Sequence, residues 1–485
     1  MSYGDSLMVF LQITTKLNHK VKMKRVLSSI VILWTAAASL LAQLPDTLIF
    51  NESSFLKQAL DYAPAIKNAQ LEVSIQNQEF LAAKGAFEPK IGGKYSVKEF
   101  DSKNYYNKQQ TRVQVKTPIG IRVDGGLLSN DGIFLNPESN VPSSGLMYAG
   151  IEVPLGAGLF TDADRTYLKQ QRLENDAASL GNTLSVNDYL LEAGEQYWDW
   201  YESIMLLRIS EEAVLLASSR LKFIKRKNSI GEAADIDTLE AFINFQNRTA
   251  YYIANLIKYQ KSSNYIQNYI WMPDRAKGSL VPEVDLDYDA IFPNSILEKN
   301  FVYTHPIIRL LETDSLINQA NIILAKEYFK PQVDVAFRLQ ESANTVSDFN
   351  YNITDNHYVG VNLKMPLFLR KERAKSKQLS YEGEIIGNKK SEMLAKIENA
   401  QKTYYYNSIE LKKSVALWKT ASINYGTLLS AEQTKLTLGE SSLFVVNNRE
   451  LKWIDAREKY IKNYVEYRKA ILGYYYSLVL LPEIL

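Results

Sequence analysis

The sequence predicts an α+β membrane protein made of two similar halves, in which short strands form part of a transmembrane β-barrel and long helices continue it as a coiled coil. Three observations predict this fold. One set of motifs occurs twice, the spacing of apolar residues changes at a proline in each half, and a secretory signal is followed by no transmembrane helix. At 485 residues, 46% of them hydrophobic, the chain is large enough for such a structure.

The duplicated motifs keep their order along the chain. Ala63-Pro64 recurs 242 positions later as His305-Pro306, Pro154-Leu155 recurs as Pro366-Leu367, and Ile230-Gly231-Glu232 recurs as Leu438-Gly439-Glu440. A repeat of about two hundred residues is much longer than a solenoid unit, so two pseudo-symmetric halves of one object are expected. We expect a first repeat over 43–272, a linker or equatorial segment over 273–294, and a second repeat over 295–485.

The start of the chain predicts export. Met23-Lys24-Arg25 precedes an uncharged apolar run, 26–41, that ends before Ala42. This pattern is typical of a signal peptide over 1–42, with an upstream extension before Met23 and cleavage after Ala42. The alternative is a membrane anchor, but the run is shorter than the ~20 residues that span a bilayer. Since only helices and closed barrels satisfy the backbone in lipid, an exported protein that stays in a membrane would be a barrel.

Each half predicts a helix followed by a strand. A heptad stripe of mostly apolar and small residues runs through a helix expected from about 55 to 88, and the stripe recurs in the second half with polar interruptions. After Pro89 and Pro331 the apolar period becomes two, as in strands with one apolar and one polar face. The first stripe consists of Ile66, Ala69, Val73, Gln76, Phe80, Ala83 and Phe87, and the strand alternation begins with Ile91, Tyr95 and Val97 and with Val333, Val335, Phe337 and Leu339.

Two long helices are predicted beyond the strands, from near Asp162 to Gly231 and from near Arg370 to Gly439. At 1.5 Å per residue each is about 100 Å long. The shorter helices, including one from about 239 to 271, would pack against them end to end. An aromatic heptad stripe near the C-terminus is expected in the core: Trp453, Tyr460, Tyr464, Tyr467, Ile471, Tyr474 and Leu478.

About four strands per chain are expected, and four strands cannot close a barrel. Because open sheet edges in lipid cost several kcal/mol per unpaired group, neighbouring copies would have to complete the wall, and three chains would supply twelve strands. The first hairpin is 30 residues longer than the second. The extra residues form either an enlarged extracellular loop or one additional hairpin. A soluble antiparallel sheet with one wet face is the alternative to a barrel.

These motifs resemble those of the TolC-like outer-membrane efflux proteins, over nearly all of the mature chain. The residues that carry the resemblance are Ala59 to Pro64, the helix-to-strand prolines, the two Pro-Leu pairs and the two glycine turns. The resemblance implies two outer-membrane efflux repeats in a homotrimeric outer-membrane channel with a periplasmic helical tunnel. It also implies a periplasmic adaptor, and an inner-membrane pump of the proton-driven RND or ATP-driven ABC type, for drugs, metals, other small molecules or proteins.

The glycine turns are the candidate docking site. In the family the corresponding turns lie at the periplasmic tip and engage the adaptor, which assigns that role here to Ile230, Gly231 and Glu232 and to Leu438, Gly439 and Glu440. Glycine suits such a turn because it tolerates positive φ. Turning the chain is a structural role that these glycines have in either case.

A constriction at the tip has two candidate compositions. Some members of the family close the tip with aspartates six and nine residues after the second glycine, but Val445 and Asn448 stand there. Asp237 in the first half could instead form a ring of charge in an oligomer, with Asp235 expected as a helix N-cap. The competing hypothesis is an apolar constriction lined by Leu443, Phe444 or Val445.

Composition excludes several other classes of function. The net charge of +2 gives no basic field for nucleic acid, and the absence of cysteine removes thiol catalysis and cysteine-ligated zinc. Three scattered histidines and the lack of nucleotide or zinc-protease motifs predict no metal site, no cofactor and no enzyme activity. Two rival hypotheses are a secreted coiled-coil structural or adhesive protein without a pore, and a periplasmic adaptor.

Overall fold

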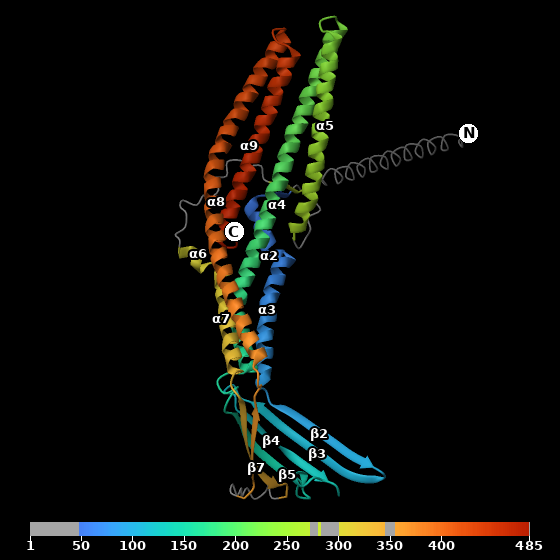
Figure 1. The fold of residues 1–485 in the computed structure, drawn as a ribbon. Coiled ribbons are helices and arrows are strands. Elements are labelled where there is room, and N and C mark those ends of the chain that lie inside the picture. Colours follow the sequence, from blue (N-terminus) through green and yellow to red (C-terminus); the bar gives the residue numbers. More distant parts are fainter. Residues whose placement is uncertain (1–47, 272–279, 283–299, 345–354, 485) are drawn as a thin grey trace, which may run out of the picture.

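The computed structural model describes residues 48–271, 280–282, 300–344 and 355–484. Helices form a long body, and a curved sheet extends from one end of it (Figure 1). The predicted signal peptide and most of the predicted linker lie outside the described residues. No helix in the described ranges combines the length and the hydropathy that a membrane span requires.

The helical body contains two very long helices, as the sequence predicts. They have 67 and 69 residues, and glycines in the left-handed conformation follow both, Gly231 with φ 79° and Gly439 with φ 80°. The Asp162 carboxylate caps the first by accepting from the backbone N–H of Asp164 at 3.0 Å. The helices are α2 (Glu52–Tyr62), α3 (Pro64–Lys84), α4 (Ala163–Ser229), α5 (Asp235–Ile266), α6 (Asn300–Thr304), α7 (Pro306–Glu327), α8 (Arg370–Leu438) and α9 (Leu443–Ser477), with 3-10 turns η1 (Gly85–Phe87), η2 (Pro137–Ser139) and η3 (Gln267–Tyr269).

The shorter helices pack along the long ones. Near the sheet, α3, α4, α7 and α8 lie in a row, and toward the far end the row is α5, α4, α9 and α8. The prediction of a single helix over 55–88 is wrong, because two helices occupy this range. The first, α2, ends at Tyr62 and the second, α3, begins at Pro64, since Ala63 before the proline adopts an extended conformation. The heptad stripe from Ile66 to Phe87 is confirmed, since each member is buried or half-buried.

Aromatic side chains form the core of the helical body. Tyr197 packs against Phe55 with ring centroids 5.4 Å apart, and Trp198 packs against Tyr464 at 5.8 Å. The Tyr197 hydroxyl donates to the Phe50 carbonyl at 3.0 Å, so its polar end is satisfied. Burial raises the pKa of Tyr464 to about 12, which keeps this phenol neutral. The predicted core role of the C-terminal aromatic stripe is confirmed, with Trp453 at its margin.

The sheet has six strands, so the prediction of about four per chain is wrong. All neighbours pair antiparallel in the order β2-β3-β4-β5-β7-β8. The extra residues of the first half form one additional hairpin, β3 and β4, whose turn closes where Gly120 adopts φ 93° and donates to the Thr117 carbonyl at 2.9 Å. The strands are β2 (Lys90–Phe100), β3 (Lys103–Lys116), β4 (Arg122–Asp131), β5 (Leu146–Pro154), β7 (Gln332–Ser342) and β8 (His357–Lys364), while β1 (Leu48–Phe50) and β6 (Leu280–Pro282) form a separate parallel pair.

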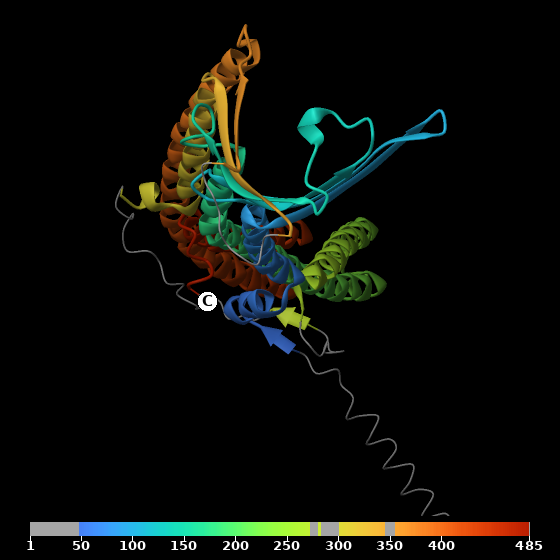
Figure 2. The same cartoon turned by 90° about the horizontal axis from the view of Figure 1, so that it is seen from below.

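Seen along the long axis, the sheet is curved and does not close on itself (Figure 2). Its outer strands, β2 and β8, each have one edge without a partner strand in the described chain. A closed wall therefore requires strands from elsewhere.

Candidate functional site

The two faces of the sheet differ in chemistry. One face carries apolar side chains that are open to the surroundings, among them Ile91 at 79% exposure, Val361 at 67% and Leu363 at 69%. The opposite face carries charged and polar side chains, because directly paired residues of antiparallel strands point to the same side. We call these the apolar face and the polar face. Their alternation is the pattern predicted for strands with lipid on one side and water on the other.

Two ionic clusters cover the polar face. In the first, Asp124 accepts from Arg112 at 2.9 Å and from Arg338 at 3.1 Å. In the second, Arg122 contacts Asp334 at 3.0 Å and also forms an ion pair with Glu152. Asp124 is only 3% exposed, and both arginines lie within ion-pair distance of its carboxylate.

These clusters indicate which side of the sheet is concave. Arg338 on β7 contacts Asp124 on β4, although β5 lies between these strands. Side chains two strands apart approach each other on the concave side of a curved sheet and diverge on the convex side. The polar face is therefore the inner face, and the apolar face is the outer one.

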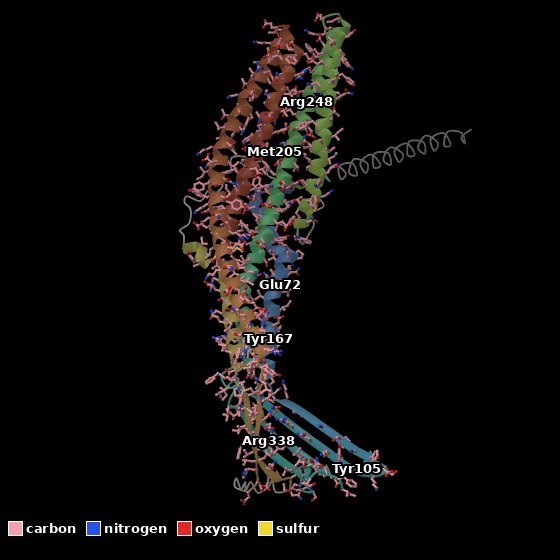
Figure 3. All side chains as sticks on the ribbon, viewed as in Figure 1. Glu72, Tyr105, Tyr167, Met205, Arg248 and Arg338 are labelled. Carbon is pink, nitrogen blue, oxygen red and sulfur yellow. The ribbon has the colours of Figure 1, made fainter. Side chains whose placement is uncertain are left out.

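Gly150 on β5 makes room for the Arg338 side chain to pass over this strand to Asp124. A Cβ at Gly150 would lie 2.2 Å from the Phe337 carbonyl oxygen and 2.6 Å from Cγ of Arg338. The guanidinium of Arg338 then lies 5.7 Å from the ring centre of Tyr148 and 5.5 Å from that of Tyr358. Figure 3 shows Arg338 within the sheet and Tyr105 at its far end.

Both glycine turns lie at the end of the body farthest from the sheet, one at the tip of the α4–α5 hairpin and one at the tip of the α8–α9 hairpin (Figure 1). Glu232 donates its backbone N–H to the Lys227 carbonyl at 2.8 Å, and Glu440 donates to Lys435 at 2.9 Å. Ile230 and Leu438 are 64% and 68% exposed. Both predicted docking turns thus lie at the same end of the body, and each presents an apolar and an acidic side chain.

The predicted constriction residues lie just inside these turns but differ in exposure. Phe444 is 68% exposed and Asn448 is exposed, while Val445 is half-buried. Leu443 is buried in a cluster with Leu221, Ile224 and Ala241, between α4, α5 and α9.

Asp237 caps α5. Its carboxylate accepts from the backbone N–H of Ala234 at 3.2 Å. The expectation of Asp235 as the N-cap is wrong, because Ala234 occupies that position and Asp235 accepts from Asn228 at 2.9 Å.

A buried ionic bridge below the tip was not predicted. Glu450 on α9 is 0% exposed and accepts from Arg220 on α4 at 2.5 Å and from Arg248 on α5 at 2.9 Å. Arg248 is labelled in this part of the body in Figure 3. The sequence did contain an indication that Glu450 is buried, since it stands at a heptad position in line with Trp453 and Tyr460.

Comparison with known proteins gives a match through structure alone. No protein-family profile and no curated protein matches the sequence. Among solved structures, the CmeC outer membrane channel of Campylobacter jejuni matches with a TM-score of 0.65 and 11% identity, over 88% of this chain and 85% of that chain. The chain has the TolC-like outer-membrane channel fold.

Two further structures with this fold agree. The outer membrane protein VceC of Vibrio cholerae matches with a TM-score of 0.62 and 12% identity, covering 88% of this chain and 95% of its own. The open state of the MtrE outer membrane channel of Neisseria gonorrhoeae matches with a TM-score of 0.60 and 13% identity, covering 88% of each chain. In the TolC-like fold of this chain, the polar face of the sheet and the glycine turns are the two candidate sites.

Proposed function

We propose that this chain is the outer-membrane channel of a tripartite efflux or type I secretion system and conducts substrates passively to the exterior. The observation that carries the proposal is the two-faced, open sheet at the end of a long helical body. Its outer face is apolar and uncovered, as contact with lipid requires, and its inner face is charged, as contact with water requires.

The unpaired edges support assembly with neighbouring copies, and we propose that the assembly is a homotrimer. In lipid, each unsatisfied backbone group at an edge of β2 or β8 would cost several kcal/mol, so edges of neighbouring copies pair. Three copies of a six-stranded sheet form a barrel of eighteen strands in place of the twelve expected from four strands each. Barrels of about this size enclose an aqueous channel.

The helices carry matching uncovered surfaces. A heptad stripe on α5 is exposed throughout and has apolar side chains at Ile236, Leu239, Ile243, Ile253 and Ile257. The helix at the opposite end of the row, α8, exposes a stripe with Tyr406, Leu417 and Leu428. Packing α5 of one copy against α8 of the next covers both stripes and continues the barrel as a helical tunnel in the periplasm.

The glycine turns are the proposed docking site for a periplasmic adaptor, which connects the channel to an inner-membrane RND or ABC pump. Exposed Ile230 and Leu438 would supply apolar contact, and Glu232 and Glu440 would supply charge. At the same end, Asp237, Phe444, Val445 and Asn448 are the proposed constriction, supported by the buried Leu443. The pump provides the energy, so no catalytic site is needed.

Conductance in planar bilayers tests the proposal. The full-length exported protein, purified in detergent, should fractionate with the outer membrane, migrate as a trimer and form discrete pores. A protein that is monomeric without detergent and forms no pores would instead support the secreted coiled-coil alternative, and a stable dimer would overturn the trimer.

Docking is tested at the turns themselves. Gly231→Pro and Gly439→Pro should abolish export while trimers still reach the outer membrane and conduct, whereas Gly231→Ala serves as the milder control at the same position. Normal export by both proline variants would contradict the docking assignment.

A further inference from the structure

We propose that the polar face of the sheet selects anions, so that the substrates of this channel are anionic solutes bearing carboxylate, sulfate or phosphate groups. The inference rests on the proposed function, since it assigns a substrate class to the pore wall. It starts from the charges that the strand register places on this face.

Basic side chains outnumber acidic ones on the polar face. The paired positions of the strands, up to the register shift at Lys98/Glu99, define which residues share this face. Nine are basic and three are acidic, which leaves an excess of six positive charges on a chain whose net charge is only +2. The basic residues are Lys90, Lys94, Lys98, Lys108, Arg112, Lys116, Arg122, Arg338 and Lys364, and the acidic residues are Asp124, Glu152 and Asp334.

The three carboxylates are already neutralised. Asp124 lies between two arginines, and Glu152 and Asp334 share Arg122. These arginines therefore contribute little free charge to the lumen, and no carboxylate of this face remains to attract cations.

Five lysines stay without a carboxylate partner within the part of the chain that the structure describes. Lys116 is excluded, because it binds Asp162 at 3.0 Å and Asp164 at 2.5 Å, at the start of α4. Lys108 donates to the Ser139 hydroxyl at 3.0 Å, and the Lys98 ammonium lies 5.0 Å from the ring centre of Tyr105. The other three, Lys90, Lys94 and Lys364, are exposed.

The position of these lysines amplifies their effect. Lys94 belongs to β2 and Lys364 to β8, the two outer strands, which come together where neighbouring copies join. In a trimer each lysine becomes one of three around the pore, and rings of Lys or Arg favour anions. A narrow passage with a low-dielectric wall strengthens the field of such rings.

A simpler explanation for lysines on outer strands is that they prevent the strand edges from pairing with wrong partners before assembly. The two roles give different results in an electrical measurement. Edge protection requires no ion selectivity of the finished pore, whereas the proposal requires anion selectivity that changes with the lysines.

The test is the reversal potential of full-length channels in planar bilayers under a KCl gradient. At ~0.1 M salt, where the Debye length is about 10 Å, we expect chloride permeability several-fold above potassium permeability, with the ratio falling toward one at ~1 M. Lys94→Glu combined with Lys364→Glu should lower the ratio to one or below, and the same pair changed to Gln should give an intermediate value. Lys57→Glu on α2 makes the same kind of charge change on an exposed residue away from the sheet and should leave the ratio unchanged.

Pores that conduct but prefer cations, or whose ratio is the same in the double variant, would overturn the inference and leave the channel assignment intact. Non-selective wild-type pores together with aggregation of the double variant would assign the lysines to edge protection and also overturn it. Absence of any conductance would overturn the proposed function itself, and this inference with it.

Discussion

The helical body and the sheet are stabilised in different ways. In the body, one chain buries its own core, with Leu190, Ala193 and Ala213 each 0% exposed. In the described sheet, no residue of the apolar face is buried by the chain itself, and the buried carboxylates Asp124 and Asp334 lie in ion pairs on the polar face. The body therefore carries its own solvent-excluded interior, whereas the sheet has none within one chain; under the proposed function, lipid and neighbouring copies supply it.

This difference predicts where substitutions are costly. A truncation in the body should leave a cavity or an unpaired charge, and the same kind of truncation on the apolar face should leave a space that lipid or detergent fills. The following predictions test this contrast, beginning with the largest effect.

Glu450→Ala should have the largest effect on stability. It leaves Arg220 and Arg248 buried without their carboxylate, which costs about 3–5 kcal/mol when one partner of a buried ion pair is removed. Denaturant unfolding of the detergent-solubilised protein measures the loss. Glu410→Ala, which removes an exposed pair with Lys413, is the control and should cost below about 1 kcal/mol; equal losses in both would contradict the distinction.

Leu190→Ala should destabilise the body by about 2–5 kcal/mol, because its side chain is 0% exposed and packs in the aromatic core. Val361→Ala on the apolar face of β8 should change stability by less than about 0.5 kcal/mol in detergent. Thermal unfolding of both variants compares them directly. A large effect of Val361→Ala in detergent-solubilised monomers would show that the sheet has a core of its own.

Acid should weaken the body through His305, the N-cap of α7. Burial lowers the pKa of His305 from 6.5 to about 4, and its neutral Nδ1 accepts from the Ile307 N–H at 3.3 Å. Because the unfolded state binds this proton first, the stabilisation is complete above pH 6.5 and is lost as the pH falls toward 4, by at most about 3 kcal/mol.

His305→Asn keeps a capping side chain that does not titrate. Unfolding curves recorded from pH 7 to pH 4 should show a smaller loss for this variant than for the natural sequence. Parallel curves for the two proteins would rule out His305 as the cause.

A smaller effect than those of the buried substitutions in the body is expected at the tip. Gly439→Ala should lower the free energy of unfolding by about 1 kcal/mol. An alanine backbone at φ 80° is strained, although the added Cβ would meet no atom within 4 Å. Hydrogen exchange should become faster around the turn while the melting temperature hardly changes. Gly387→Ala, at an open position inside α8, should instead stabilise by about 1 kcal/mol, so a loss there would contradict the explanation by backbone conformation.

Local pattern predicted much of the fold. The heptad stripes located the helices, Asp162 and the two glycines located the ends of α4 and α8, and the prolines located the change from helix to strand. The break at Pro64 was missed because the heptad stripe begins only at Ile66 and gives no information on the residues before the proline. The additional hairpin could not be separated from a long loop, because alternation in β3 is weak and only pairing on both sides makes it a strand.

The sequence by itself determined most of the elements, the two-faced strands, the glycine turns and the heptad stripes, since each depends on the spacing of residues along one segment. Only the tertiary structure decided which charges meet. Arg338 and Asp124, and Arg220 and Glu450, lie more than two hundred positions apart, and their pairing depends on strand order and helix packing. The sign of the free charge on the polar face also emerged only there, because the strand register decides which lysines share a face and which carboxylates the arginines neutralise.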